Sequence, residues 1–227
     1  MSAAVRSSRP SIYSTAVGKK YAMAISGMVL MAFVLLHMIG NLKIYFGASA
    51  LDDYSHWLRT VGEPALPEQA LLWAARIILL AALAVHLHAA YALTMINRRA
   101  RPDAYRSKRD FVAADFASRT MRWTGIIVLL FVIFHLLDLT WGPANPDFVA
   151  GDPYHNVITS FQRVPVALVY VIANLALGVH LYHGGWSMFQ SMGWTRPWRR
   201  QFAVVFAGLI VLGNVSFPLA VMFGVLS

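Results

Sequence analysis

The sequence contains no cysteine among its 227 residues. Disulfide bonds are therefore excluded, and so is the covalent attachment of a c-type haem through a C-x-x-C-H motif. This chain alone also cannot hold a conventional iron–sulfur cluster, because cysteine thiolates bind such clusters. Any redox centre carried by this chain must use other ligands.

Charged residues are scarce as well. They make up 13% of the chain, and 58% of its residues are hydrophobic, whereas a soluble domain carries about a quarter charged residues. About 20 apolar residues suffice to cross a bilayer. Five runs are this long, at 21–46, 71–96, 123–141, 164–188 and 202–226. We therefore predict an all-α, polytopic membrane protein with five transmembrane helices in a bundle, since a β-barrel would show short alternating segments.

Acidic residues are fewer than basic ones, which gives a net charge of +9. The basic residues gather before the first run and in the links between runs two and three and between runs four and five. They are Arg6, Arg9, Lys19, Lys20, Arg98, Arg99, Arg101, Arg106, Lys108, Arg109, Arg119, Arg122, Arg196, Arg199 and Arg200. These alternate segments lie on one side, and the positive-inside rule makes that side cytoplasmic. The N-terminus is then cytoplasmic and the C-terminus outside.

The same pattern gives the expected organisation and location. Residues 1–20 form a basic cytoplasmic segment, and residues 21–227 form the transmembrane domain of a multi-pass protein of the cytoplasmic membrane. The opposite side holds mostly acidic residues, among which we count Asp138, together with a few basic ones such as Arg163. A basic cytoplasmic face suits anionic membrane lipid or an acidic soluble partner, and not nucleic acid.

The predicted spans contain several histidines. His56 and His155 fall in the outer links, where we expect solvated or interfacial loops. The other six lie within four different spans: His37, His86, His88, His135, His180 and His183. Polar groups at membrane depth are costly and usually mark function. One of them could be a contact between helices, but six indicate a shared function.

The histidines also sort by depth. With a helix rise of about 1.5 Å per residue, His37 and His135 lie in the outer half of the membrane, and the other four lie in the inner half. Such an arrangement suits two redox centres, one above the other, each held by imidazoles from facing helices as b-type haem requires. His86 and His88 point about 200° apart on a helix, whereas residues three apart, as His180 and His183 are, share a face. Spacing alone does not choose within either inner pair.

Nearby glycines, such as Gly27 and Gly125, could let a flat macrocycle approach the backbone, although ordinary helix packing explains them equally well. No internal repeat is evident in the sequence.

Four segments, in order, resemble the single-chain, five-helix cytochrome b membrane anchor of succinate dehydrogenase/fumarate reductase (respiratory complex II). They are FVLLHMIGN around His37, HAAYALT from His88, RWTGIIVLLFVIFHLLD around His135, and HLYHGGWSMFQSMGW from His180. The resemblance implies two haem b groups, the outer one held by His37 and His135 and the inner one by His88 and His180. His86 and His183 are extra relative to that pattern. They raise the alternative of a histidine-ligated iron–sulfur or non-haem iron centre at the inner site.

The resemblance also implies partners. A flavoprotein subunit would oxidise succinate, and an iron–sulfur subunit would pass the electrons to this anchor, which itself performs no succinate chemistry. The anchor would deliver them to a membrane quinone, for which menaquinone is plausible. A quinone site needs hydrogen-bond donors beside apolar walls. The candidates near the inner face are Ser26, Tyr91, Arg122, Trp123, His183 and Trp186.

Two other functions fit the same residues. The cytochrome b subunit of another membrane oxidoreductase, such as a hydrogenase or a formate dehydrogenase, would also use histidine pairs in a helical bundle. A proton-coupled transporter would use the histidines as proton relays.

Overall fold

The structure is a computed structural model, and it describes residues 11–100, 112–194 and 196–227, with the backbone alone described at 112–119. Arg6 and Arg9 of the predicted basic segment lie outside the described residues. So do Arg101, Arg106, Lys108 and Arg109 of the predicted basic link.

Every regular element in the described residues is a helix. In chain order they are η1 (Ile12–Ser14), α1 (Ala16–Asn41), η2 (Leu42–Phe46), α2 (Ala48–Thr60), α3 (Ala70–Arg99), α4 (Val112–Leu139), α5 (Pro153–Gln162), α6 (Val164–Ser191) and α7 (Trp198–Met222). Five stretches are long and apolar enough to cross a membrane, and they lie in α1 with η2, in α3, α4, α6 and α7. The prediction of an all-α chain with five membrane helices is therefore confirmed.

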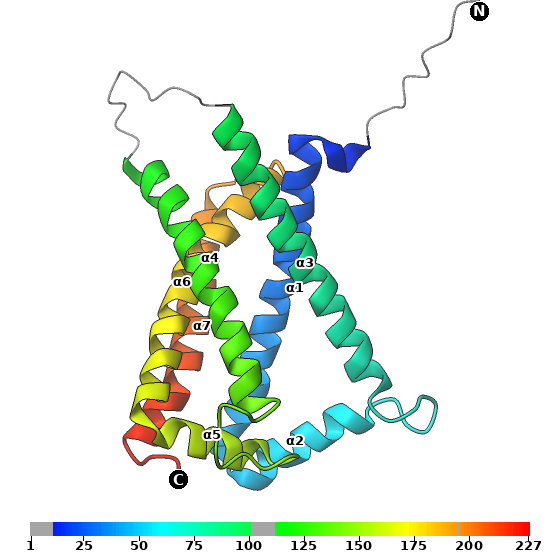
Figure 1. Cartoon of the computed structure of the whole chain (residues 1–227), viewed down its shortest axis with the longest axis vertical. Helices are drawn as coiled ribbons and strands as arrows, with labels where there is room; N and C mark the ends of the chain where they lie inside the picture. The colour runs from blue at the N-terminus through cyan, green and yellow to red at the C-terminus, as the bar shows by residue number, and fades with distance from the viewer. Residues whose placement is uncertain (1–10, 101–111, 195) are drawn as a thin grey trace, which may run out of the picture.

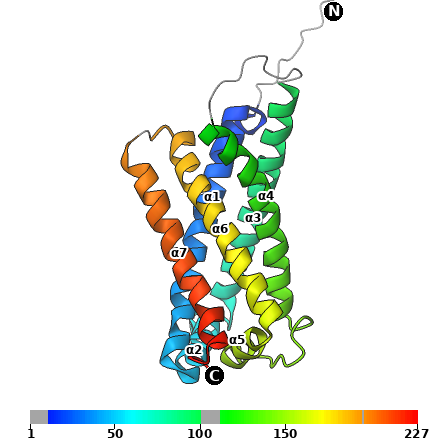
Figure 2. The same cartoon turned by 90° about the vertical axis from the view of Figure 1, so that its left-hand side faces the viewer.

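The long helices pack in pairs. Helix α1 lies along α3, and α4 lies along α6 (Figure 1). Helix α7 packs on α6, and α1 also contacts α6 and joins the two pairs (Figure 2). We call the end where α1 begins the basic end; α3 finishes there, and α6 is linked to α7 there. The described chain ends at the opposite end, beside α2 and α5 (Figure 1).

Local signals set several helix boundaries. The side chain of Thr15 caps α1 by accepting a hydrogen bond from the backbone N–H of Gly18. The Asp152 carboxylate caps α5 in the same way, at the N–H of His155. Pro153 is the first residue of α5, and Pro165 lies in the first turn of α6. At such positions the missing N–H of proline costs nothing, and its fixed φ favours the helix.

The two short helices correct the prediction for the outer links. His56 lies on α2 and His155 on α5, whereas loops were expected. His56 is exposed, and Nε2 of His155 lies 2.9 Å from the backbone oxygen of Asp147. Helices α2 and α5 are too short to contain the long apolar run by which the spans were recognised. They are stabilised by packing on each other and on the bundle.

Candidate redox centres

The first histidine pair lies toward the opposite end of the bundle and joins α1 to α4. The ring centroids of His37 and His135 are 5.9 Å apart, and their planes are nearly perpendicular at 85°. Phe33, one turn before His37, stacks on its ring at 5.3 Å. The amide nitrogen of Asn41 lies 3.2 Å from Nε2 of His37. We call this the outer pair.

The second pair lies nearer the basic end and joins α3 to α6. The ring centroids of His86 and His180 are 6.3 Å apart, with their planes at 68°. A hydroxyl lies 3.4 Å from Nδ1 of each ring: Ser26 Oγ beside His86 and Thr124 Oγ1 beside His180. Both hydroxyls donate to backbone oxygens one turn earlier, at 2.7 and 2.8 Å. Each hydroxyl oxygen can then accept from Nδ1–H, and Nε2 would be left to bind a metal ion. We call this the inner pair.

Glycines lie against both inner rings. A Cβ at Gly27 would lie 3.4 Å from Cε1 of His86, and one at Gly125 would lie 3.5 Å from Cε1 of His180. A methyl group would just contact each ring, whereas a branched side chain would displace it. Gly40 and Gly178 serve a different purpose, since a Cβ there would collide with Tyr54 and with Val211, respectively. Those two glycines allow close packing.

The structure reveals a short repeat, contrary to the expectation that the chain contains none. Ser26-Gly27 precedes His37 on α1, and Thr124-Gly125 precedes His135 on α4, with nine residues between glycine and histidine in each case. The tripeptide Val-His-Leu occurs at 85–87 and again at 179–181. The α1–α3 and α4–α6 helix pairs thus contribute matching residues to both histidine pairs. Between glycine and histidine the two segments also share Phe-Val, at 33–34 and 131–132, whereas their other residues differ. The signal therefore emerges only when the histidine contacts align the two segments.

His88 lies away from the inner pair. Its Nδ1 is 2.5 Å from the hydroxyl of Tyr13, and the two rings stack with centroids 5.7 Å apart. Lys19 holds the η1 turn in place by donating to the backbone oxygens of Tyr13 and Ser14, both at 2.9 Å. His183 is buried, with its ring beside that of Tyr182. The structure therefore brings His86, and not His88, across from His180.

A buried ionic network adjoins the outer pair. Asp138 was counted among the charges of the outer side, and it lies within α4, one turn after His135, with 0% of its side chain exposed. Its carboxylate accepts hydrogen bonds from Ser160 at 2.5 Å, from Tyr170 at 2.8 Å and from Arg163 at 2.6 Å. Arg163 and Asp138 therefore neutralise each other inside the bundle.

Tyr170 connects this network to the outer pair. Its hydroxyl lies 3.4 Å from Nδ1 of His135 while it donates to Asp138. The hydroxyl oxygen can thus accept from Nδ1–H, and the carboxylate behind it fixes its orientation. Sequence reasoning missed this role, although the i, i+3 spacing of His135 and Asp138 was a usable signal.

The six quinone candidates lie on four helices, α1, α3, α4 and α6. Ser26 is buried and bonds its own helix and His86. Tyr91 on α3 and Trp123 on α4 are 67% and 70% exposed. Trp186 lies beneath the guanidinium of Arg199, with the carbon of that group 6.0 Å from the ring. The remaining two are Arg122, which is exposed, and His183. A common quinone pocket stays a prediction.

The two histidine pairs fit axial ligation of iron. Two imidazoles bound on opposite sides of one metal, each at about 2 Å through a ring nitrogen, place their centroids roughly 6 Å apart. Both observed separations agree with this value. Groups of three or more histidines and carboxylates suited to a metal ion are absent from the described residues. The described geometry thus supports two-ligand sites, and the kind of iron centre at the inner site stays a prediction.

These features define a class of protein: a multi-span helical membrane protein with facing histidine pairs at two depths. The family model for the succinate dehydrogenase/fumarate reductase transmembrane subunit matches residues 95–215. That match covers more than half of the chain, and the chain belongs to this family. Neither a curated protein nor a solved structure matches it.

Family membership has direct consequences. The chain is a subunit of a succinate dehydrogenase/fumarate reductase complex and a multi-pass membrane protein. It is the membrane anchor of that complex, and its partners are the catalytic subunits of complex II. Membership makes haem b a possible cofactor. It favours this family over the cytochrome b subunits of other oxidoreductases and over a transporter.

Proposed function

We propose that this chain is the electron-transfer anchor of its complex, passing electrons from a soluble iron–sulfur subunit to membrane quinone through two haem b groups. The observation that carries the proposal is the presence of two facing histidine pairs, at centroid separations of 5.9 and 6.3 Å, contributed by four different helices. Haem, when bound, would supply a one-electron carrier at each pair. Structural packing alone gives no reason for matched imidazole pairs at two depths in an apolar bundle.

The inner ligands in this proposal are His86 and His180. The resemblance alone favoured His88, but the ring of His88 is engaged by Tyr13 at 2.5 Å, while His86 faces His180. His86 also has a hydroxyl behind it and a glycine beside it, as His180 does. These matching surroundings on two facing helices support His86 and His180 as the pair that would hold a haem. The outer ligands are His37 and His135.

The surrounding side chains orient these ligands. Ser26 and Thr124 each hold Nδ1 of an inner imidazole, which directs Nε2 toward the partner helix. Tyr170 does the same for His135, and Asp138 in turn fixes Tyr170.

The basic end is the cytoplasmic end in this proposal, with the N-terminus inside and the C-terminus outside. The described basic residues at the ends of the long helices support this orientation by the positive-inside rule. They also suit docking of the iron–sulfur subunit, which would place the inner pair nearer to the electron donor. The quinone, menaquinone being plausible, would bind among the donors predicted near this end.

The direct test is a dithionite-reduced minus oxidised absorbance spectrum of the purified complex. Sharp α and Soret bands corresponding to two haems per chain would support the proposal. A flat spectrum from an intact complex, with its flavin and iron–sulfur subunits present, would refute haem ligation.

The ligand assignment has a sharper test. His86→Ala should remove one haem per chain and leave the other, because it deletes one inner ligand. His88→Ala is the matched control, two residues along the same helix, and it should retain both haems. The reverse outcome, with His88→Ala losing a haem and His86→Ala keeping both, would contradict the assignment.

A further inference from the structure

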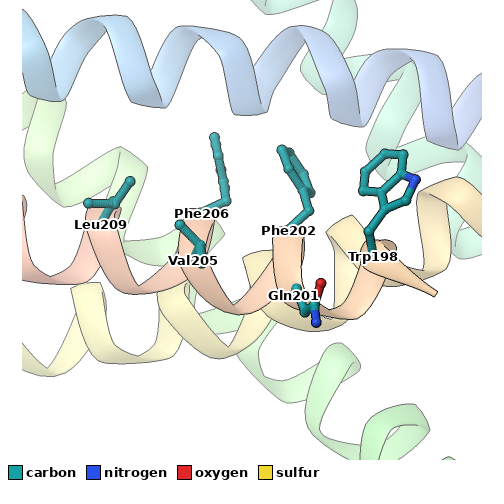
Figure 3. A pocket seen from close by; sticks show the side chains of 6 residues that line it. All are labelled: Trp198, Gln201, Phe202, Val205, Phe206 and Leu209. Carbon is teal, nitrogen blue, oxygen red and sulfur yellow. The ribbon is translucent and has the colours of Figure 1, made fainter. Parts of the chain in front are cut away.

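An apolar groove runs along one face of α7, away from the histidine pairs. It has a volume of about 380 Å³ and is lined by Trp198, Gln201, Phe202, Val205, Phe206 and Leu209. The rings of Trp198, Phe202 and Phe206 project from α7 into the space beside α1 (Figure 3). Helices α1 and α7 both pack on α6 and make only limited contact with each other. All six lining residues belong to α7, so the groove is a feature of the face of α7 that points toward α1.

A more polar pocket adjoins the groove at the basic end. This second pocket has a volume of about 450 Å³ and is lined by Gly193, Trp194, Arg196 and Trp198. Trp198 lines both, so the two pockets adjoin each other. Next to it, the buried Nη1 of Arg199 has no hydrogen-bond partner within the described part of the chain. The sequence from 187 to 209 contains no acidic residue, and the described residues form no ion pair with the arginines at this mouth.

The dimensions of the groove match a lipid chain. From Trp198 to Leu209 the helix advances about 16 Å at 1.5 Å per residue. Half of the hydrocarbon core of a bilayer is about 15 Å thick. An acyl chain that enters beside Trp198 would therefore reach the membrane midplane at the far end of the groove. The two tryptophans at the mouth lie where aromatic side chains mark the boundary between lipid and water.

We propose that this groove is a binding site for one anionic phospholipid. Its phosphate pairs with Arg196 in the polar pocket, and one acyl chain lies along Phe202, Phe206 and Leu209. Basic pockets between membrane helices on the basic side bind such headgroups. A quinone would fill the apolar part equally well, but it would leave the charge of Arg196 without a counter-ion. The site is separate from both histidine pairs, so the proposal does not depend on the electron-transfer function.

Fluorescence quenching by brominated lipids tests the proposal in the intact purified complex. The complex is reconstituted with phosphatidylglycerol or phosphatidylcholine that carry identical brominated acyl chains. The difference in quenching between the unmodified complex and its Trp198→Phe variant gives the signal of Trp198. We expect phosphatidylglycerol to quench Trp198 at a several-fold lower mole fraction than phosphatidylcholine. Equal quenching by the two lipids would overturn the proposal.

Two variants separate headgroup from chain. Arg196→Gln should weaken the preference for phosphatidylglycerol roughly five-fold, since a basic residue near the membrane surface contributes about that much. Arg98→Gln is the matched control, an exposed arginine at the same end of the bundle, and should keep the preference. Val205→Phe should fill part of the exposed groove without adding a tryptophan, and should reduce the quenching of Trp198 by both lipids. An unchanged preference in Arg196→Gln, or release of the quenching by added menaquinone in place of lipid, would overturn the proposal.

Discussion

Replacing Asp138 by asparagine tests the buried network beside the outer pair. The carboxylate is fully buried and accepts three hydrogen bonds, one of them from Arg163 at 2.6 Å. Asparagine keeps the shape but removes the charge, and its amide group adds donors where only donors face it. Arg163 is then left in the bundle without a counter-charge.

The expected loss of stability follows from that geometry. Removing one member of a buried ion pair costs about 3–5 kcal/mol. The Arg163 side chain is 28% exposed and also donates to the backbone oxygen of Ala144 at 2.7 Å, so part of its charge stays solvated or bonded. We therefore expect a cost near the lower end of that range, about 3 kcal/mol for Asp138→Asn. Ser160→Ala removes only one hydrogen bond to the carboxylate and should cost about 1.5 kcal/mol.

The assay is the free energy of unfolding in mixed detergent micelles, followed by circular dichroism. A double-mutant cycle with Arg163→Gln isolates the pairing, and we expect the double variant to be more stable than the sum of the two single losses predicts, by about 2 kcal/mol. Strict additivity of the two substitutions would refute the ion pair. A loss below about 0.5 kcal/mol for Asp138→Asn, within the range of ordinary surface substitutions, would refute its burial.

Three further predictions concern the histidine pairs. Gly125→Val should displace the His180 ring and remove the inner haem signal. Gly208→Val, at a glycine on α7 with open space around it, is the control and should keep that signal. Equal spectra for the two variants would show that Gly125 is not needed. Tyr170→Phe should retain haem but raise the midpoint potential of the outer centre, because His135 loses the acceptor that makes it a stronger ligand, and an unmoved potential in a redox titration would exclude this role. His37→Ala and His135→Ala should each remove the same component of the reduced-minus-oxidised spectrum, and loss of different components would separate the two residues.

Much of this protein could be predicted from its sequence. The five spans followed from long apolar runs, because a bilayer requires about 20 such residues in a helix. The histidines could be ordered by depth, because helix rise and alternating direction place each residue along the membrane normal. The division into outer and inner histidines needed no knowledge of how the helices touch. The helices α2 and α5 were missed, because short helices without a long apolar run depend on tertiary packing.

Only the tertiary structure distinguished residues that share a depth. His86 and His88 are two positions apart, so the rotation of α3 about its own axis decides which of them faces α6, and that rotation is set by packing on α1. The same applies to Asp138, which the sequence placed only near the outer end of the third run, and whose partners on α5 and α6 allow it to be buried. The sequence determined the chemistry and its depth; the rotation and pairing of the helices determined which side chains meet, because a membrane helix can turn any of its faces inward at the same depth.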